Sequence, residues 1–169
     1  MSGKKMLFAT DYSQASDYAL RYATWLASCS CMQARLLIVH VSELEPYPVG
    51  ESSVVEPQPN PQELERLKAV VPKDPGVRYE HHLLHGSPGS AEITKPAEVI
   101  LRFAQEEHVD IIVLGTHGRS GLSHLLMGSV AESVIRHADC PVVTIRQPKE
   151  AKQRGTEWSE LASANRSGV

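Results

Sequence analysis

Cysteines, aromatic residues and long apolar runs are all scarce in this chain of 169 residues. It has three cysteines, and no run approaches the roughly 20 apolar residues that span a bilayer. The apolar stretch near the N-terminus is too short for the core of a signal peptide. An odd cysteine count without secretory features is typical of a reducing compartment, so we expect a cytoplasmic protein that does not contact membrane.

A strong charge of one sign is also absent, because 17 Lys and Arg face 20 Asp and Glu. Nonspecific binding to nucleic acid depends on neutralising phosphates with basic residues, so we expect no nucleic-acid partner. Hydrophobic residues make up 41% and charged residues 22%, as in an ordinary globular domain. The apolar pattern stops after Gln147, which predicts one domain over residues 1–146 and a polar, mostly disordered tail over 147–169.

Two groups of cysteines and histidines, residue types that often bind metals, lack the usual spacing of a metal site. Cys29 and Cys31 form C-x-C with no matching ligand pair after them, so we interpret them as small apolar residues near a helix end. His81 and His82 would point to opposite faces of a strand, and His85 would lie in a loop. The sequence therefore favours no metal site at either place.

Short apolar runs alternate with amphipathic segments along the chain. Ser13 is placed to cap the first helix, Pro96 fits the first turn of the third, and the proline-rich residues 45–61 predict a loop or flap. The expected strands are residues 5–10, 35–41, 77–84, 110–115 and 141–146, and the expected helices are residues 15–26, 62–71, 96–104 and 128–138.

Alternating strands and helices indicate a parallel sheet covered by helices on both faces. We expect a Rossmann-like α/β fold, a three-layer α/β/α sandwich with a five-stranded parallel sheet in the order 3-2-1-4-5. Ligands bind such sheets where the winding reverses, here between the carboxyl ends of the first and fourth strands. Thr10, Asp11 and Gly115 end these strands. Asp11 would accept a hydrogen bond from a ligand or help to hold a magnesium ion carried by phosphates; alternatively it is a plain turn residue.

The loop after the fourth strand is rich in glycine. Gly115, Gly118 and Gly128 lie in it, and Ser129 follows at a helix start. Glycine lets the backbone approach a phosphate closely, and the helix N-terminus adds unpaired N–H groups and a partial positive charge. The alternative is a plain turn followed by a capping box, in which Glu132 reaches back towards Ser129.

Signatures of familiar nucleotide enzymes and hydrolases are absent. The sequence has no P-loop, no Gly-x-Ser-x-Gly and, after the first strand, no Ser-Gly-Gly-x-Asp-Ser loop of the ATP-pyrophosphatase type. His117 and Arg119 lie in the glycine loop and face either phosphate or solvent. Asp11 and Arg119 supply only part of what phosphoryl transfer needs. We therefore expect slow or no turnover of any ligand that this loop binds, and no catalytic residue.

The chain resembles the universal stress protein family at four places in sequence order. They are Gly115-x2-Gly118-x9-Gly128-Ser129, and residues 9–13, 37–41 and 128–143. The resemblance covers about residues 3–146. It implies a small α/β module of the adenine nucleotide alpha hydrolase-like kind, usually a homodimer. Residues 46–61, residues 89–95 and the tail beyond Arg146 depart from the family pattern.

Because the chain keeps these glycines, the resemblance places it in the ATP-binding branch and implies ATP, with magnesium, as its ligand. His117 and Arg119 join the site through their place in the loop. The residues that the resemblance places around adenine and ribose are Ala9, Thr10, Asp11 and Val41, and those around ribose and phosphates are Gly115, Gly118, Gly128, Ser129 and Val130.

The expected function is a regulatory sensor in the stress response, in which ATP occupancy orders residues 116–127. The alternatives are a slow ATPase or other adenine-nucleotide enzyme of this fold, and a ligand-free dimeric scaffold. Residues Val142–Ile145 would form an edge strand, and a β-branched edge invites antiparallel pairing with a second copy as a two-fold dimer. Alternatively, the tail after Gln147 folds back over this edge.

Overall fold

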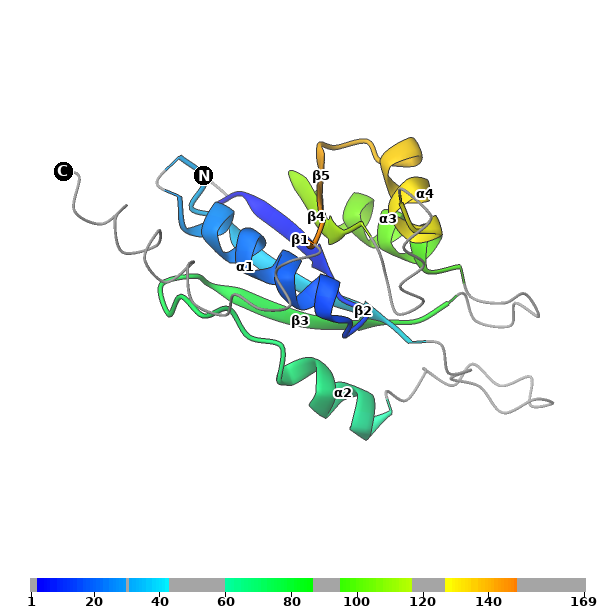
Figure 1. Cartoon of the computed structure of the whole chain (residues 1–169), viewed down its shortest axis with the longest axis horizontal. Coiled ribbons are helices and arrows are strands. Elements are labelled where there is room, and N and C mark those ends of the chain that lie inside the picture. Colours follow the sequence, from blue (N-terminus) through cyan, green and yellow to red (C-terminus); the bar gives the residue numbers. More distant parts are fainter. Residues whose placement is uncertain (1–2, 30, 43–59, 87–94, 117–126, 149–169) are drawn as a thin grey trace.

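A computed structural model of the chain shows a parallel sheet with helices on both faces (Figure 1). The structure describes residues 3–29, 31–42, 60–86, 95–116 and 127–148. The sheet has five strands in the order β3-β2-β1-β4-β5, which confirms the predicted fold and strand order. The strands are β1 Lys5–Ala9, β2 Arg35–Val41, β3 Tyr79–Leu84, β4 Ile111–Gly115 and β5 Val142–Ile145.

In the described ranges, four helices connect the strands. Pro61 begins α2 although it was expected in the proline-rich loop. A proline is tolerated there because its missing N–H would be unpaired in the first turn, and the Asn60 side chain caps the helix by accepting from Gln62 N–H at 2.9 Å. Residues 45–59 of the predicted flap lie outside the described residues. The helices are α1 Gln14–Ser28, α2 Pro61–Lys68, α3 Pro96–Glu106 and α4 Ser129–His137.

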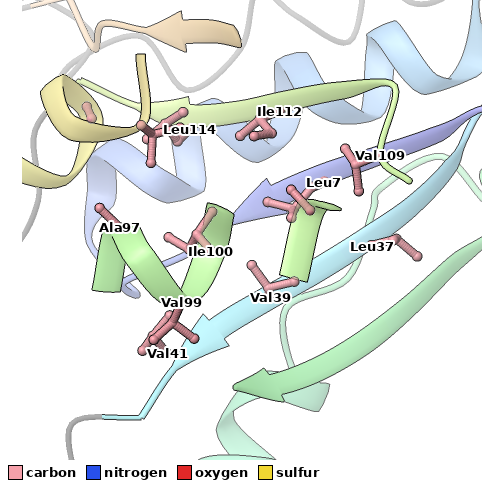
Figure 2. Close-up of a cluster of buried hydrophobic side chains, with 13 residues drawn as sticks. Leu7, Leu37, Val39, Val41, Ala97, Val99, Ile100, Val109, Ile112 and Leu114 are labelled. Atoms are coloured by element: carbon pink, nitrogen blue, oxygen red, sulfur yellow. The ribbon is translucent and has the colours of Figure 1, made fainter. Parts of the chain in front are cut away.

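Side chains along the strands alternate between two apolar cores, as a period of two requires. Leu7 and its register partner Leu37 face the core beneath α3 and α4, where Figure 2 shows Leu7 beside Ile100. Met6 and Phe8 face the opposite core, beneath α1 and α2. These strand side chains are at most 1% exposed. Close packing on both faces makes the sheet a rigid support for the residues at its carboxyl edge.

The edge strands and the histidines lie as the sequence indicates. β5 occupies one edge of the sheet with all four residues half-buried, while pairing with a second copy stays a prediction. His81 Nε2 lies 2.8 Å from the carbonyl oxygen of Val70, after α2, and the ring centroid of His82 lies 4.9 Å from that of Phe103 on α3. These contacts confirm that the two histidines point to opposite faces. None of the helices in the described ranges has the length and hydropathy of a membrane span.

The turn after α1 corrects one expectation. Cys29 is half-buried, but Cys31 is exposed, so the interpretation of both as apolar filler is wrong for Cys31. The N–H groups of Met32 and Gln33 both donate to the carbonyl oxygen of Cys29 at 2.9 Å. This tight turn ends the helix and leaves Cys31 on the protein surface.

Candidate functional site

The carboxyl ends of β1, β2 and β4 meet at one edge of the sheet. Ala9, the last residue of β1, pairs with Val39 of β2 and with Leu114 of β4. Gly115 ends β4 opposite Ile145 of β5. The predicted site residues at these strand ends therefore lie along the same edge, on both sides of the point where the strand order reverses.

Thr10 braces the turn between β1 and α1. Its N–H donates to the Val39 carbonyl at 2.9 Å, which continues the pairing with β2. Its side chain is buried; the hydroxyl lies 3.1 Å from the Ser16 hydroxyl and accepts from Tyr12 N–H at 3.1 Å. The Thr10 side chain therefore faces α1 and fixes the turn that carries Asp11.

Asp11 is held by the cap of the following helix. Its Oδ1 accepts from the Ser13 hydroxyl at 2.6 Å and from Ser13 N–H at 3.1 Å. The Ser13 hydroxyl in turn accepts from Ser16 N–H at 3.2 Å, which confirms Ser13 as the N-cap of α1. Asp11 is thus a turn residue, and its contact with a ligand stays a prediction.

Tyr12 is a residue that the sequence interpretation overlooked. It has a left-handed backbone with φ of 62°, which costs a non-glycine residue free energy and is typical of functional turns. Its ring centroid lies 4.2 Å from that of His40 and 4.1 Å from Cζ of Arg66. His40 Nδ1 lies 2.8 Å from the Thr10 carbonyl oxygen, so the ring that stacks on Tyr12 is itself held by the turn.

The Tyr12 hydroxyl is buried and has no hydrogen-bond partner in the described part of the chain. Burial raises the pKa of Tyr12 to about 12, against the opposing effect of the nearby Arg66 guanidinium. The phenol therefore stays neutral at physiological pH. In the sequence, the only feature that indicated this stacking of Tyr12 with His40 and Arg66 was an aromatic residue directly after Asp11.

The residues at the carboxyl end of β2 contact α2 and β3 at the same edge of the sheet. Val41 is 6% exposed and packs in the core beneath α3 and α4. The next residue, Ser42, donates its hydroxyl to Oε2 of Glu63 at 2.6 Å. Its N–H donates to the Leu84 carbonyl at 2.8 Å, so the Val41 end of the site is fixed by both β3 and α2.

Gly128 begins α4 beside the end of β4. Its N–H donates to the Thr116 carbonyl at 2.7 Å, so β4 and α4 meet directly at this edge. Its backbone, with φ of −76° and ψ of 155°, is one that any residue adopts. Ser129 is exposed and Val130 half-buried in the first turn that follows.

The alternative of a capping box at Ser129 is also wrong. The N-cap of α4 is Gly128, and no side chain in the described part of the chain caps this helix. Oε1 of Glu132 instead accepts from Nη2 of Arg136 at 2.8 Å, on the next turn of α4. The first-turn N–H groups have no acceptor within the helix, and with the helix dipole they favour an anion.

The remaining phosphate-side residues lie outside the described residues. They are His117, Gly118 and Arg119, so the structure places none of the three.

The chain is similar to proteins of one family. The model described as "Universal stress protein family" matches residues 3–146. A universal stress protein of Methanocaldococcus jannaschii is 31% identical over 153 residues, which cover 87% of this chain and 84% of that protein. Another, from Thermus aquaticus, is 35% identical over 147 residues, which cover 85% of this chain and 98% of that protein.

A solved structure shows a similar fold. The universal stress protein from Archaeoglobus fulgidus in complex with dAMP is 26% identical, with a TM-score of 0.59. The match covers 86% of this chain and 99% of that chain.

Proposed function

Since the chain belongs to the universal stress protein family, we propose that it is an ATP-binding regulatory module of the stress response. One observation carries the proposal. The uncapped first turn of α4 begins next to the end of β4, at the edge of the sheet that also bears Asp11 and Val41. A helix N-terminus at the switch point of a parallel sheet is a natural place for a phosphate group.

We place the triphosphate at the β4–α4 end of this edge. Gly115 ends β4 there, and the N–H groups and hydroxyl of the first turn of α4 supply donors from Gly128, Ser129 and Val130. Each such contact contributes on the order of 1 kcal/mol, so several must act together. In the proposal His117, Gly118 and Arg119 complete this part of the site, with magnesium accompanying the phosphates.

Adenine and ribose belong, in this proposal, at the β1–β2 end. Ala9, Thr10 and Asp11 follow the buried part of β1, and Val41 ends β2. Their positions are fixed by the hydrogen bonds of Ser13, Ser16 and Ser42 rather than by a ligand. The Archaeoglobus fulgidus relative, solved in complex with dAMP, supports an adenine nucleotide as the ligand class.

We infer a sensor rather than an enzyme, working in the cytoplasm as a homodimer paired through β5. Asp11 is already held by two hydrogen bonds from Ser13, and Asp11 with Arg119 supplies only part of what phosphoryl transfer needs. The alternatives are a slow ATPase or other adenine-nucleotide enzyme of this fold, and a ligand-free dimeric scaffold.

Thermal unfolding with and without Mg-ATP tests the binding step. A ligand at 100 times its Kd that binds only the folded state adds about 2.7 kcal/mol, which for a protein of this size raises Tm by several degrees. Replacing Gly128→Val together with Ser129→Leu should remove the shift while leaving the far-UV spectrum unchanged. His137→Gln, at the other end of the same exposed helix surface, is the matched control and should keep it.

Two outcomes would replace the proposal. No Tm shift, with no nucleotide extractable from the purified protein, would favour the scaffold. Steady, rapid release of phosphate from ATP would place the protein among enzymes of the same fold.

A further inference from the structure

A pocket of about 270 Å³ opens at the amino edge of the sheet, where β4 and β5 begin. α3 and α4 lie side by side on one face of the sheet (Figure 1), and both helices end at this pocket. The proposed nucleotide site lies at the carboxyl edge, where α4 begins at Ser129. The pocket is therefore a separate feature of the fold.

The walls of the pocket are apolar. The side chains of Ala104, Val109 and Ile112 are at most 7% exposed and belong to the core beneath α3 and α4. Leu101 and Ala138, which are half-buried, complete the apolar lining. An apolar cavity of about 150 Å³ is large enough to hold benzene, so this pocket accommodates a single substituted ring. A ring placed here removes apolar surface from water.

The end of α3 fixes the shape of the pocket. The N–H of Val109 donates to the Ala104 carbonyl at 2.9 Å. The N–H of His108 donates to the Gln105 carbonyl at 3.1 Å. These two bonds form the helix-ending motif that usually has glycine at its left-handed position, which here is His108 with φ of 52°. The pocket is thus set by the fold before any ligand binds, which lowers the cost of binding.

The mouth of the pocket has a negative electrostatic potential. Asp139 lines it, and its Oδ2 accepts from Nε2 of Gln105 at 2.7 Å. The last carbonyl groups of α3 and α4 add partial negative charge, because both helices end here. Burial, followed by the charges of Asp139 and Asp110, raises the pKa of the Cys140 thiol, which also lines the pocket. The potential favours a cationic ligand over an anionic one.

The basic residues around the pocket do not cancel this potential. Among the described residues that line it there is no lysine or arginine, and His108 is the only basic side chain. Arg136, in the last turn of α4, is paired with Glu132 at 2.8 Å. Nζ of Lys5 is paired with Glu107, which follows α3, at 2.7 Å. The charge that a ligand meets at the mouth is therefore mainly that of the carboxylates.

We propose that this pocket binds a small organic cation, a primary amine carried on a single aromatic ring. The ring lies against Val109 and Ile112, and the ammonium group donates to the carboxylate of Asp139. A carboxylate has about four acceptor sites, so Asp139 can keep its bond from Gln105 and accept from the ammonium group as well. The proposal is independent of the nucleotide site, which lies at the opposite edge of the sheet.

Phenethylamine is the probe for the test, with the full-length ¹⁵N-labelled protein. We expect saturable shifts of the amides of Val109, Asp139 and Cys140, and weaker binding of phenethyl alcohol, which lacks the charge. Asp139→Asn should raise the Kd at least about tenfold, because a hydrogen bond between two ions is replaced by a weaker one. Glu98→Gln removes the same charge at the other end of α3 and should leave the Kd unchanged.

The thiol of Cys140 supplies a second readout inside the pocket. Phenethylamine should slow its alkylation by iodoacetamide, while exposed Cys31 should react at an unchanged rate. Peptide mass spectrometry measures both rates in the same sample. Ala138→Leu should fill the pocket and abolish the protection of Cys140, and the far-UV spectrum checks that this variant folds.

Three results would overturn the proposal. They are equal binding of phenethylamine and phenethyl alcohol, an unchanged Kd in Asp139→Asn, and shifts at Ser129 in place of Cys140. Binding that appears only after Trp158→Ala, or only on dilution of the protein, would also overturn it, since the chain's own tail or a second copy would then occupy the pocket.

Discussion

The amide nitrogen of Gly128 lies 2.7 Å from the carbonyl oxygen of Thr116. This hydrogen bond joins the end of β4 to the N-cap of α4 and brackets residues 117–126. The first turn of α4 is therefore positioned by the sheet itself.

Ser13 links helix capping to the position of Asp11. Its hydroxyl accepts from Ser16 N–H and donates to Oδ1 of Asp11. Ser13→Ala should lower the free energy of unfolding by about 1 kcal/mol through the lost cap. It should also weaken Mg-ATP binding, since Asp11 loses the shorter of the two hydrogen bonds that orient it and keeps only the one from the backbone N–H of residue 13.

Urea unfolding and ATP titration measure the two effects of Ser13→Ala separately. Ser28→Ala is the control, because the Ser28 hydroxyl only donates to the Trp25 carbonyl at the far end of α1. Equal losses of stability in the two variants would contradict the capping role of Ser13.

The Tyr12 hydroxyl is a buried polar group without a partner in the described part of the chain. Burying such a group costs about 1–3 kcal/mol, whereas the ring contacts with His40 and Arg66 do not need it. Tyr12→Phe should therefore leave stability unchanged or raise it. Tyr12→Ala should lower stability because it also removes the ring. Thermal denaturation of both variants checks this, and a loss of stability in Tyr12→Phe would show that the hydroxyl has a partner.

The Lys5–Glu107 ion pair predicts a pH dependence of stability. A hydrogen bond from Lys5 Nζ, at 2.7 Å, is the main cause that lowers the pKa of Glu107 below its ordinary value. A carboxyl group whose pKa is lower in the folded than in the unfolded protein stabilises the fold. This stabilisation is fully present above the pKa of the unfolded state, about 4.3 for Glu. It disappears as the pH falls through the lower pKa of the folded state. The Glu107 side chain is 38% exposed, so the effect should stay below about 1 kcal/mol.

Unfolding of wild type and Glu107→Gln across this acid range measures the contribution of the pair. The variants should differ in stability at neutral pH and converge in acid. A difference that grows as pH falls would contradict the assigned sign.

The position of β5 at the edge of the sheet predicts the oligomeric state. Thr144 lies in this half-buried edge strand, and a lysine there would oppose antiparallel pairing with a second copy. Thr144→Lys should reduce the solution mass from dimer to monomer without loss of the fold. Tyr79→Lys places the same charge on the opposite edge strand, β3, and should remain dimeric. Light scattering after gel filtration gives the masses, and a monomeric wild type would contradict the pairing.

The sequence predicted the elements well where apolar periodicity decides structure. The aliphatic run Arg35–Val41 forms β2 with the expected bounds, and the alternation of strands and helices correctly predicted a parallel sheet. The carboxyl ends that carry Asp11 and Gly115 were also placed correctly, because parallel strands end at a common edge.

Details that depend on contacts between distant residues could not be predicted. Gly128 rather than Ser129 caps α4 because Thr116 of the preceding strand end accepts its N–H. Tyr12 tolerates a left-handed backbone because His40 and Arg66 pack on its ring. None of these three partners adjoins its residue in sequence, so no local pattern reveals the contacts.

The most direct test of the account is a titration of the ¹⁵N-labelled protein with Mg-ATP, followed by the backbone amide resonances. We predict that the largest saturable shifts fall on the first turn of α4, at Ser129 and Val130, and on the turn that carries Asp11, while the amide of His137 stays unchanged. Shifts confined to other regions, or no saturable shift at millimolar ATP, would contradict a nucleotide site at this edge.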